Sequence, residues 1–407
     1  MLDHTPLRFA VLQPGARLHY ALPAVLQRAG MLERLYTDFC ASTGPLRHLE
    51  NLWPRPFQPA SVRRMFGRKL PAEIPHAKVR EVPAAVMREK AAKIFPKAGT
   101  NSAATLLSVA RKERFGGANA IYTVLVNEDI DTCREAKKQG CKIVHEAMIG
   151  PDVGLWLNEE SKIFPGRGHN GSSIERVNAG RERDRMKYEI ADLIIAPSDF
   201  VKNAVVALGA DPERVAVVPY GIDESWLQTK SEPERGRVLF VGSVSFRKGN
   251  HYLAEATRLL ARRGLGCDVR VVGPVNRRIL NDPLFHGPNY IGQIPRAEVC
   301  HEFQAADVFV LPTLCDSFAL VHLEAMACGV PVITTPNCGS VVRDGIDGMI
   351  VPIRSATAIA NAIERIVTDK NLRDAMSRSA RERAASFTLK QYGDRLVSAL
   401  SEVQASQ

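Results

Sequence analysis

One stretch of 46 residues, from Asp307 to Pro352, constrains the fold of this chain more than any other. Its apolar run Val308–Leu311 ends at Pro312 and predicts a buried strand. Val330–Thr334 predicts a second buried strand. Between the two strands, a helix that ends at Gly329 is predicted from apolar side chains at helical spacing: Phe318, Leu320, Val321, Leu323, Met326 and Ala327. A strand, a helix and a strand in this order predict a parallel sheet, and so an α/β fold.

Two carboxylates frame the predicted helix. Asp316 lies in the loop before it, and Glu324 lies about two turns into it. The backbone amides near Phe318, Ala319 and Leu320 would then be free donors, and such a helix start binds anions, phosphate in particular. We expect the two acids to hold sugar or ribose hydroxyl groups on either side of a phosphate. The plainer interpretation, for each acid alone, is a capping Asp316 and a solvent-exposed Glu324.

The stretch resembles the C-terminal domain of the retaining glycosyltransferases of family four, which have the GT-B fold. Their signature is a carboxylate, seven residues and a Glu, within E-G-F-G-L-x-x-L-E-A-M-A-x-G-x-P-V-I. From Asp316 to Ile333 this chain has D-S-F-A-L-V-H-L-E-A-M-A-C-G-V-P-V-I, with departures at Asp316, Ser317 and Ala319. The resemblance implies two Rossmann-like domains facing across a cleft, and sugar transfer from a nucleotide-activated donor with retention at the anomeric carbon. It implies that Asp316 contacts the donor sugar and Glu324 the ribose.

The rest of the sequence fits this organisation. A chain of 407 residues suggests two domains. We expect residues 1–196 to form an acceptor-binding domain, residues 197–387 a donor domain, and residues 388–407 a helix that packs back across the domain junction, as in the family. Helices are also predicted near Ala356–Thr368 and Leu372–Ala385. The apolar runs have only strand length, and the start lacks the features of a signal peptide, so we expect a cytoplasmic protein. Eight Cys without a close CxxC pair predict reduced, buried thiols.

The N-terminal part begins like an α/β domain. A strand is predicted at Phe9–Leu12 and a helix at Tyr20–Ala29, with Gly15 in the turn between them. Because Gly15 has no Cβ, backbone there can approach a sugar or a diphosphate, although a plain turn is the alternative. A later strand ends at His145 and Glu146, and ligands of open parallel sheets bind beyond such strand ends. The resemblance implies that His145 contacts the donor sugar, and Glu146 is an acceptor-side candidate.

Three further segments have informative local patterns. The acids in Asp129-Ile130-Asp131 precede a predicted helix, so we interpret them as capping and first-turn residues rather than as a metal site. The polar stretch from Asn158 to Arg185 predicts a loop that shapes the acceptor site, followed by a helix from about Arg183 to Ala191. The run AVVPYGID resembles the family's V-I-P-N-G-V-D at the entry to the donor domain, with Tyr220 in place of Asn.

A second strand, turn and helix follow at Val238–Val241, Gly242–Gly249 and Asn250–Arg263. The turn combines backbone amides with Arg247 and Lys248, which is what a diphosphate requires; a solvated Arg–Lys pair is the alternative. The resemblance implies that Lys248 binds the donor diphosphate. The family's Arg, five residues earlier, is Ser243 here, so we expect Arg247 to supply the second charge. We expect Gly242 and Ser243 to line the donor site, and the resemblance places backbone near Ile294 against the base.

The segment from Arg47 to Lys97 differs in character from the rest of the chain. It holds twelve Lys or Arg and only four Glu, in a chain of net charge +10, with Trp53, Phe57 and Phe66 interleaved. This pattern favours an anionic membrane surface or an anionic acceptor, and the alternative is a solvated face. No nucleic-acid motif accompanies it, so we expect no nucleic-acid partner. The protein would then work as a peripheral protein on the inner face of the membrane.

The sequence therefore predicts a glycosyltransferase that uses a UDP- or GDP-linked sugar and a glycan or lipid-linked acceptor, without a metal or other cofactor. Its expected role is the synthesis of cell-surface polysaccharide or glycolipid. Two alternatives are a sugar-nucleotide epimerase of the same fold and a non-catalytic nucleotide-sugar-binding protein. A dehydrogenase is disfavoured because no G-x-G-x-x-G follows a strand.

Overall fold

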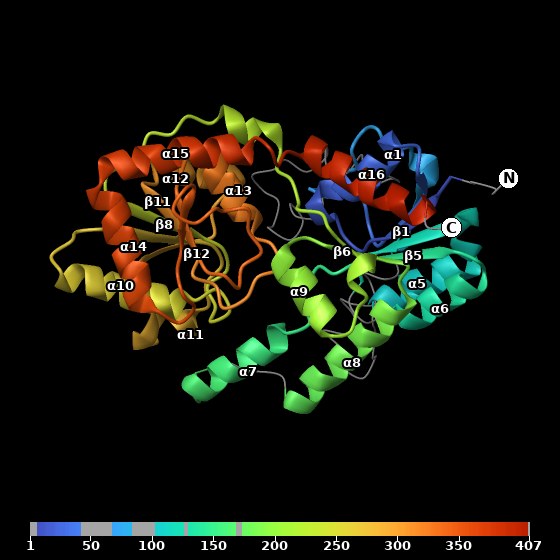
Figure 1. Cartoon of the computed structure of the whole chain (residues 1–407), viewed down its shortest axis with the longest axis horizontal. Helices are drawn as coiled ribbons and strands as arrows, with labels where there is room; N and C mark the ends of the chain where they lie inside the picture. The colour runs from blue at the N-terminus through green and yellow to red at the C-terminus, as the bar shows by residue number, and fades with distance from the viewer. Residues whose placement is uncertain (1–5, 42–66, 84–101, 126–128, 168–172, 406–407) are drawn as a thin grey trace.

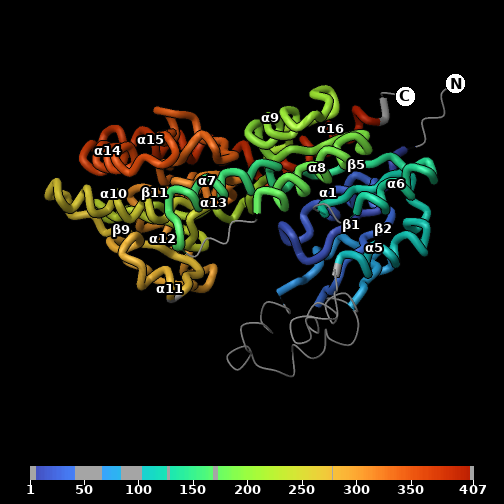
Figure 2. The backbone as a smooth tube through the Cα atoms, turned by 90° about the horizontal axis from the view of Figure 1, so that it is seen from below, coloured from blue at the N-terminus to red at the C-terminus, as the bar shows by residue number. Residues whose placement is uncertain are grey.

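A computed structural model describes residues 6–41, 67–83, 102–125, 129–167 and 173–405. Over these residues the protein has two lobes side by side, each built on a parallel sheet (Figures 1 and 2). The first sheet has seven strands in the order β3-β2-β1-β4-β5-β6-β7, and the second has six in the order β10-β9-β8-β11-β12-β13. Two parallel α/β domains were predicted, and this expectation is confirmed.

The first lobe contains the elements from β1 to β7. Its strands are β1 (Phe9–Leu12), β2 (Leu32–Thr37), β3 (Val79–Glu81), β4 (Ala120–Thr123), β5 (Lys142–Glu146), β6 (Leu193–Ala196) and β7 (Val215–Val217). Its α-helices are α1 (Ala21–Arg28), α5 (Ser102–Lys112), α6 (Ile130–Lys138), α7 (Val153–Ile163), α8 (Ile174–Ile190) and α9 (Asp199–Ala207). Short 3₁₀ helices lie at η1 (Arg17–Tyr20), η3 (His76–Lys78), η4 (Arg114–Gly117) and η5 (Pro212–Arg214).

The second lobe contains the elements from β8 to α15. Its strands are β8 (Arg237–Val241), β9 (Asp268–Val272), β10 (Asn289–Gly292), β11 (Val308–Val310), β12 (Val332–Thr334) and β13 (Gly348–Ile350). Its α-helices are α10 (Asn250–Arg262), α11 (Arg277–Leu280), α12 (Arg296–Ala305), α13 (Leu320–Ala327), α14 (Ala356–Thr368) and α15 (Lys370–Ala384). The 3₁₀ helices η6 (Glu224–Gln228) and η7 (Pro283–Phe285) complete it, and α16 (Leu389–Ala405) ends the described chain.

The central strands of both sheets are buried on both faces. Every residue of β1, β4 and β6 is buried, and so is every residue of β11 and β12. These strands are continuous apolar runs because helices cover parallel sheets on both faces, which leaves no polar face to alternate. The apolar runs of strand length that predicted these strands arise from this burial on both faces.

The first sheet extends past residue 196, where the boundary between the domains was predicted. The strand β7 pairs with β6 through Ile194 and Val215, so it belongs to the first sheet. The segment that leads to the second lobe therefore begins after Val217. The reason is that β7 follows α9 directly and completes one more strand–helix–strand unit, which the predicted boundary divides.

The helix α16 returns to the first lobe after the second is complete. It packs against α1, and its residues Tyr392, Leu396 and Leu400 are buried in the same apolar core as Phe9 and Val25. Figure 1 shows α16 beside α1, far from the helix α14 that precedes it by two elements. The final helix therefore contributes to a core formed by the start of the chain.

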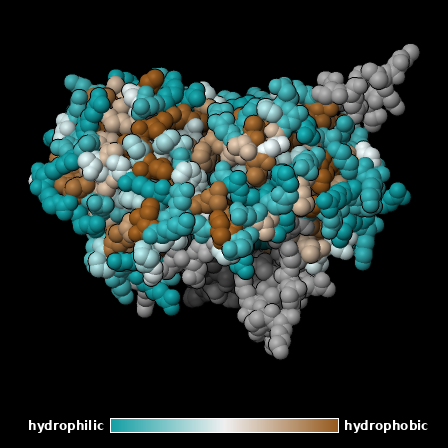
Figure 3. All heavy atoms as spheres, turned by 60° about the horizontal axis from the view of Figure 1, so that its bottom comes forward, coloured by the Kyte–Doolittle hydropathy of each residue, from teal (hydrophilic) through white to brown (hydrophobic). Residues whose placement is uncertain are grey.

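The predicted loop from Asn158 to Arg185 was wrong, because α7 and α8 occupy most of it. Polar residues surround α8 and leave it without an apolar stripe, so only its last part, from about Arg183, was predicted as a helix. Local interactions support it instead: Ser173 caps its start by accepting a hydrogen bond from the backbone amide of Arg176, and Arg185 pairs with Glu182 one turn away. Figure 3 turns the α7 and α8 side toward the viewer and shows a polar surface with separate apolar patches.

Three other sequence-based expectations concern the chain as a whole. All eight cysteines lie in the described part of the chain and are thiols outside disulfide bonds, and six of them are buried, as predicted. Among the described residues, no helix combines the length and the apolar character that crossing a membrane requires. Most of the basic segment from Arg47 to Lys97 lies outside the described residues, which include only its part from 67 to 83.

Candidate active site

The cationic turn, residues Ser245–Gly249, lies between β8 and α10 and is held in shape by its own side chains. The side chain of Asn250 accepts a hydrogen bond from the backbone amide of Ser245 at 2.9 Å, and the amide of Lys248 donates to the Ser245 hydroxyl at 3.4 Å. Gly249 has φ +70°, and a Cβ there would stand 1.9 Å from the carbonyl oxygen of Pro312. Only glycine combines this conformation with such a close approach.

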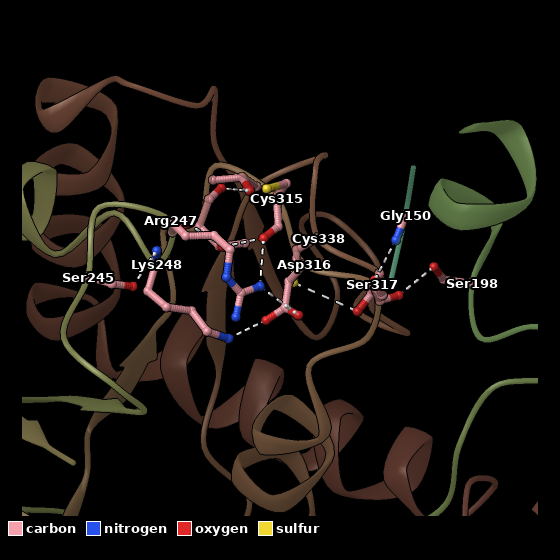
Figure 4. A network of polar contacts seen from close by, with 12 residues as sticks. Gly150, Ser198, Ser245, Arg247, Lys248, Cys315, Asp316, Ser317 and Cys338 are labelled. Atoms are coloured by element: carbon pink, nitrogen blue, oxygen red, sulfur yellow. Dashed lines mark hydrogen bonds and ion pairs between the residues drawn. The ribbon is translucent and has the colours of Figure 1, made fainter. Parts of the chain in front are cut away.

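Arg247 and Lys248 both reach Asp316, which lies in the loop before α13 (Figure 4). The ammonium group of Lys248 pairs with Oδ2 of Asp316, and Arg247 lies 3.5 Å from Oδ1 and donates to the carbonyl oxygen of Cys315 at 3.2 Å. Burial alone would raise the pKa of Asp316, but the two cations, Lys248 above all, hold that pKa below its usual value. The predicted cations and the first acid are thus brought together as one ionised cluster.

The start of α13 differs from the expected set of free amides. The helix begins at Leu320, and the amide of Ala319 donates to the carbonyl oxygen of Gly339 at 3.0 Å, so it is not a free donor. Asp316 does not cap the helix. The N-cap residue is Ala319, and no side-chain capping hydrogen bond is made there. The expectation for the amides of Phe318 and Leu320 stays a prediction.

Glu324, the second acid, stands in different surroundings from Asp316. Its side chain is 17% exposed and lies 3.4 Å from Arg296, whose guanidinium group stacks over the ring of Trp226 at 5.5 Å. Burial raises the pKa of Glu324 to about 7, because a single, largely exposed Arg296 offsets only part of the desolvation. Glu324 is therefore neither fully ionised nor the solvent-exposed residue of the plainer interpretation.

Glu324 lines a cleft of about 750 Å³ that lies between the two lobes. One wall comes from the first lobe, through Ala16, Leu18 and His19 of the loop between β1 and α1. The remaining lining comes from the connecting segment and the second lobe, and from the start of α16: Gly221, Ile222, Asp223, Ser225, Trp226, Thr229, Arg296, Ala297, Cys300, Leu320, Glu324 and Leu389. Lys248 and Asp316 do not line this cleft, so the two acids of the motif face separate surroundings.

The loop between β1 and α1 carries Gly15 as expected, but it is shaped by other residues. Gly15 has φ +71°, and its amide donates to the side chain of Asp38 at 2.7 Å. Leu18, His19 and Tyr20 also have positive φ values between 47° and 60°, which is costly for residues with a Cβ. Such strain collects at functional sites, and His19 from this run lines the cleft.

His145 lies at the end of β5 but is turned into the protein. It is 4% exposed and its ring lies 6.0 Å from that of Tyr188 on α8. Burial and the nearby charge of Lys187 keep the pKa of His145 well below its usual value, so the ring is neutral. Among the contacts of the described residues, none joins His145 to Lys248, Asp316 or Glu324. Tyr188 belongs to the part of α8 that was predicted, but its contact with His145 was not.

Glu146 anchors a cluster that sequence reasoning missed. Its buried carboxylate accepts hydrogen bonds from Tyr122 at 2.8 Å, from Tyr220 at 2.6 Å and from Arg17 at 2.8 Å. The ring of Tyr220 in turn packs edge-on against Phe318, just before α13, at 5.3 Å. The one signal in the sequence was Tyr220 itself, which departs from the family's Asn at the entry to the donor domain.

Three remaining donor-site predictions fall close to the cationic turn or to the second sheet. Gly242 ends β8 with φ 152° and its amide donates to Val272, and Ser243 beside it is exposed. Ile294 is half-buried between β10 and α12. Among the described residues, no contact links Gly242, Ser243 or Ile294 to Lys248 or Asp316. Their role in binding the donor stays a prediction.

The acids at Asp129 and Asp131 have structural partners. Asp129 is fully buried and pairs with the buried ammonium group of Lys187 at 2.6 Å, and Asp131 is exposed beside Arg134. Asp129 occupies the N-cap position of α6 without making a side-chain capping bond, so its carboxylate serves the ion pair instead. Within the described parts of the chain, no group of three or more His, Cys, Asp or Glu side chains is arranged to hold a metal ion.

Ser317 joins the two lobes beside the cationic cluster. Its hydroxyl accepts a hydrogen bond from the amide of Gly150 at 3.1 Å, and its carbonyl accepts one from the hydroxyl of Ser198 at 2.7 Å (Figure 4). A Cβ on Gly339 would stand 1.9 Å from that carbonyl oxygen. The position at which the family has Gly therefore carries a side chain that contacts the first lobe.

The second lobe matches a known protein family. Residues 223–383 match the family described as glycosyl transferases group 1. The chain is 30% identical over 227 residues to the D-inositol 3-phosphate glycosyltransferase of Kribbella flavida, covering 49% of this chain and 54% of that protein. It is 33% identical over 237 residues to the enzyme of the same name from Geodermatophilus obscurus, covering 51% and 52%. The chain thus spans about half the length of these curated relatives.

Solved structures resemble the whole chain. Sucrose-phosphate synthase from Thermosynechococcus elongatus aligns over 100% of this chain and 97% of its own, with a TM-score of 0.66 and 18% identity. Anabaena HepE in complex with UDP and glucose aligns over 98% and 100%, with a TM-score of 0.63 and 16% identity. The lipopolysaccharide outer core galactosyltransferase WaaB aligns over 97% and 99%, with a TM-score of 0.61 and 12% identity. At these identities the likeness shows the fold, which is GT-B.

Proposed function

Because residues 223–383 of this chain belong to the group 1 glycosyl transferases, we propose that the protein transfers a sugar from a nucleoside-diphosphate sugar to an acceptor. The donor binds to the second lobe at the cationic turn, and the first lobe holds the acceptor. The observation that carries this proposal is the convergence of Lys248 and Arg247 on Asp316, at the end of β8 and beside the start of α13.

The chemistry of that cluster suits a departing diphosphate. Lys248 and Arg247 are fixed before the donor arrives, so their charge stabilises the negative charge that develops as the glycosidic bond breaks, without reorganisation. Asp316 keeps the two cations in place and lies where it can contact the donor sugar. Glu324, about one turn into α13, holds the ribose hydroxyl groups from the wall of the cleft.

We propose that the reaction retains the anomeric configuration. The two acids of the motif are both paired with cations, Asp316 with Lys248 and Arg247, and Glu324 with Arg296, so neither is set up as a nucleophile. The acceptor hydroxyl therefore attacks from the face that the diphosphate leaves, and a diphosphate oxygen takes its proton. Protein cations supply the charge neutralisation, so we expect turnover to continue in EDTA; activity that manganese or magnesium must restore would contradict this.

The donor and the acceptor are proposed by class. HepE was solved with UDP and glucose, which supports a nucleotide sugar, UDP- or GDP-linked, for this chain. The names of D-inositol 3-phosphate glycosyltransferase and of the lipopolysaccharide galactosyltransferase WaaB support a phosphorylated, glycan or lipid-linked acceptor. The role we propose is the synthesis of a cell-surface polysaccharide or glycolipid.

A lipid-linked acceptor requires access to a membrane. The excess of Lys and Arg between Arg47 and Lys97 supports electrostatic binding to an anionic inner membrane face, at about 1 kcal/mol for each cation engaged. Cosedimentation with anionic liposomes should exceed that with neutral ones and weaken as salt rises. A variant with Arg63, Arg64, Arg68 and Lys69 changed to Ser should lose it; equal sedimentation of both proteins would exclude this segment as the anchor.

The experiment that tests the function is a thermal-shift panel of UDP, GDP, ADP and dTDP with their sugars, followed by turnover. A ligand at one hundred times its dissociation constant stabilises a protein by about 2.7 kcal/mol, which such a panel detects. The nucleotide sugar that binds should then be hydrolysed slowly or transferred to an added acceptor. Interconversion of the sugar without any acceptor would identify an epimerase, and binding without turnover a non-catalytic protein.

A further inference from the structure

The helix α7 belongs to the first half of the chain but docks on the second lobe. It follows β5 directly in sequence, and at its start Asp152 pairs with Arg181 of α8. Towards its other end, it contacts the start of α10 through Glu160 and Phe164. There Arg167, just beyond the helix, pairs with Asp282 of the second lobe. The helix therefore bridges the lobes beside the proposed donor site.

Glu160 is the centre of this contact. Its carboxylate is fully buried and lies 2.7 Å from Nε2 of His251, 2.8 Å from the hydroxyl of Tyr252 and 2.8 Å from Nε of Arg354. Burial lowers the pKa of His251, so its ring is neutral and donates through Nε2. Burial also opposes ionisation of Glu160, but these three donors hold its pKa below the usual value. An ionised carboxylate of the first half is thus satisfied entirely by the second lobe.

The three partners are close to the residues proposed to bind the diphosphate. His251 and Tyr252 are the second and third residues of α10, directly after the cationic turn and Asn250, whose side chain holds Ser245. Arg354 lies between β13 and α14 with φ 59°, and its guanidinium group also stacks over Trp156 of α7. Glu160 therefore fixes the first turn of α10, which directly follows the cationic turn that carries Arg247 and Lys248.

A second contact braces the same turn. Phe164, at the end of α7, lies 5.8 Å from Phe246 and 5.0 Å from His251, measured between ring centroids. Phe246 is the residue directly before Arg247 and is buried. Aromatic contacts of this kind restrict the ring and so the backbone that carries it. One polar and one apolar contact from α7 thus reach both ends of the cationic turn.

We propose that α7 is a positioning element for the donor site, with Glu160 as its central positioning residue and Phe164 as its apolar support. The cationic turn keeps Arg247 and Lys248 directed at Asp316 because the first half of the chain braces it from outside. The proposal rests on the proposed function, since it takes the ligand of that turn to be the diphosphate of a nucleotide sugar. It adds to donor binding a contribution of the first lobe, beside the residues of the cationic turn and of α13 in the second lobe.

The test compares Glu160→Gln with Glu159→Gln. Gln keeps the size of the side chain but removes the charge that the three donors share. Glu159 is the matched control, because it is adjacent on the same helix and 53% exposed, and its one ion pair within the described residues is with Arg354, at 3.2 Å. Phe164→Leu is a second variant that leaves every ion pair intact, in case Glu160→Gln does not fold.

Two measurements are made below the unfolding temperature of each variant. Hydrogen exchange of the amides of Ser245–Gly249, without ligand, reports on the turn itself and should be faster in Glu160→Gln and Phe164→Leu than in wild type and Glu159→Gln. Titration calorimetry with UDP and with GDP should show binding weakened about fivefold or more by Glu160→Gln, because a displacement of about 1 Å at a site has effects of this size or larger. Glu159→Gln should stay within about twofold, as surface substitutions do.

The outcomes distinguish the bracing of the cationic turn by α7 from the proposed function. Unchanged exchange in the turn and unchanged nucleotide affinity in Glu160→Gln and Phe164→Leu, even with a lower unfolding temperature, would show that α7 only stabilises the fold and would overturn the inference. Faster exchange in the turn with no UDP or GDP binding by the wild-type protein would contradict the proposed function while upholding the bracing by α7. Equal effects of Glu159→Gln and Glu160→Gln would also overturn the role assigned to Glu160.

Discussion

Asp316 and Glu324 share one short loop and helix, yet their carboxylates stand in opposite electrostatic surroundings. Two cations lower the pKa of Asp316 against the effect of burial, whereas burial raises that of Glu324 to about 7 with a single, mostly exposed Arg296 in opposition. At neutral pH the first acid is ionised and the second is close to its midpoint. Each difference leads to a separate prediction.

Replacing Lys248 with Met should weaken nucleotide binding by about tenfold or more, because a hydrogen bond to a charged group contributes about 1.5–3 kcal/mol. Titration calorimetry with the nucleotide identified by the thermal-shift panel measures this. Lys370→Met is the control, since Lys370 is an 87% exposed lysine paired with Asp374 on α15. Wild-type affinity in Lys248→Met would remove Lys248 from the donor site.

The raised pKa of Glu324 predicts how stability varies with pH. Between the ordinary value of 4.5 and about 7, the folded protein keeps a proton on Glu324 that the unfolded chain has released. The free energy of unfolding therefore falls as pH rises through this window and levels off above it. Glu324→Gln removes this contribution, so the unfolding temperature of wild type should fall relative to the variant as pH rises across the window. Parallel curves for the two proteins would contradict the assignment.

At the scale of elements, the junction between β8 and α10 depends on one glycine. Gly249 has a left-handed conformation, and a Cβ there would collide with the carbonyl of Pro312, which follows the neighbouring strand β11. The turn that presents Lys248 is therefore fixed by close contact with the backbone of the next strand. The helix α10 offers a matched position at its other end, where Gly264 has φ +76° and open space around it.

Gly249→Ala should lower the unfolding temperature and abolish nucleotide binding, because both the backbone strain and the collision must be relieved by moving the turn. Gly264→Ala should cost only about 1–2 kcal/mol, the penalty of the left-handed conformation alone, and should bind nucleotide normally. Differential scanning fluorimetry and titration calorimetry on both variants measure these effects. If the two substitutions behave alike, the close approach at Pro312 does not shape the donor site.

At the scale of the whole molecule, the two lobes are not independent. The helix α16 completes the core of the first lobe after the chain has built the second, and α7 and Ser317 carry contacts in the other direction. Each lobe thus depends on a segment that belongs, by sequence order, to the other. A mutation in one lobe should therefore change the stability of the other lobe as well.

Leu396→Ala in α16 should lower the free energy of unfolding by about 2–5 kcal/mol, as deletion of a buried leucine does, because Leu396 is fully buried against the first lobe. Ser398→Ala, an exposed position on the same helix, should change it by less than about 0.5 kcal/mol. Urea denaturation followed by circular dichroism measures both. A Leu396→Ala protein as stable as Ser398→Ala would mean that α16 does not complete that core.

The sequence by itself determined the parts of this protein that rest on local pattern. The strand Phe9–Leu12 and the helix Ala356–Thr368 have the predicted bounds, since apolar runs and helical periodicity report burial directly. The resemblance also assigned Lys248 and Asp316 to one donor site, but the ion pair between them was not predicted.

Only the tertiary structure decided the contacts between distant segments. Glu160 meets Arg354 across 194 residues of sequence, and Glu146 meets Tyr220 across 74, and no local period records such pairs. The same is true of His145, which packs against Tyr188 of α8. Burial of a polar side chain is a property of what packs over it, and that is set by the whole fold rather than by its neighbours in sequence.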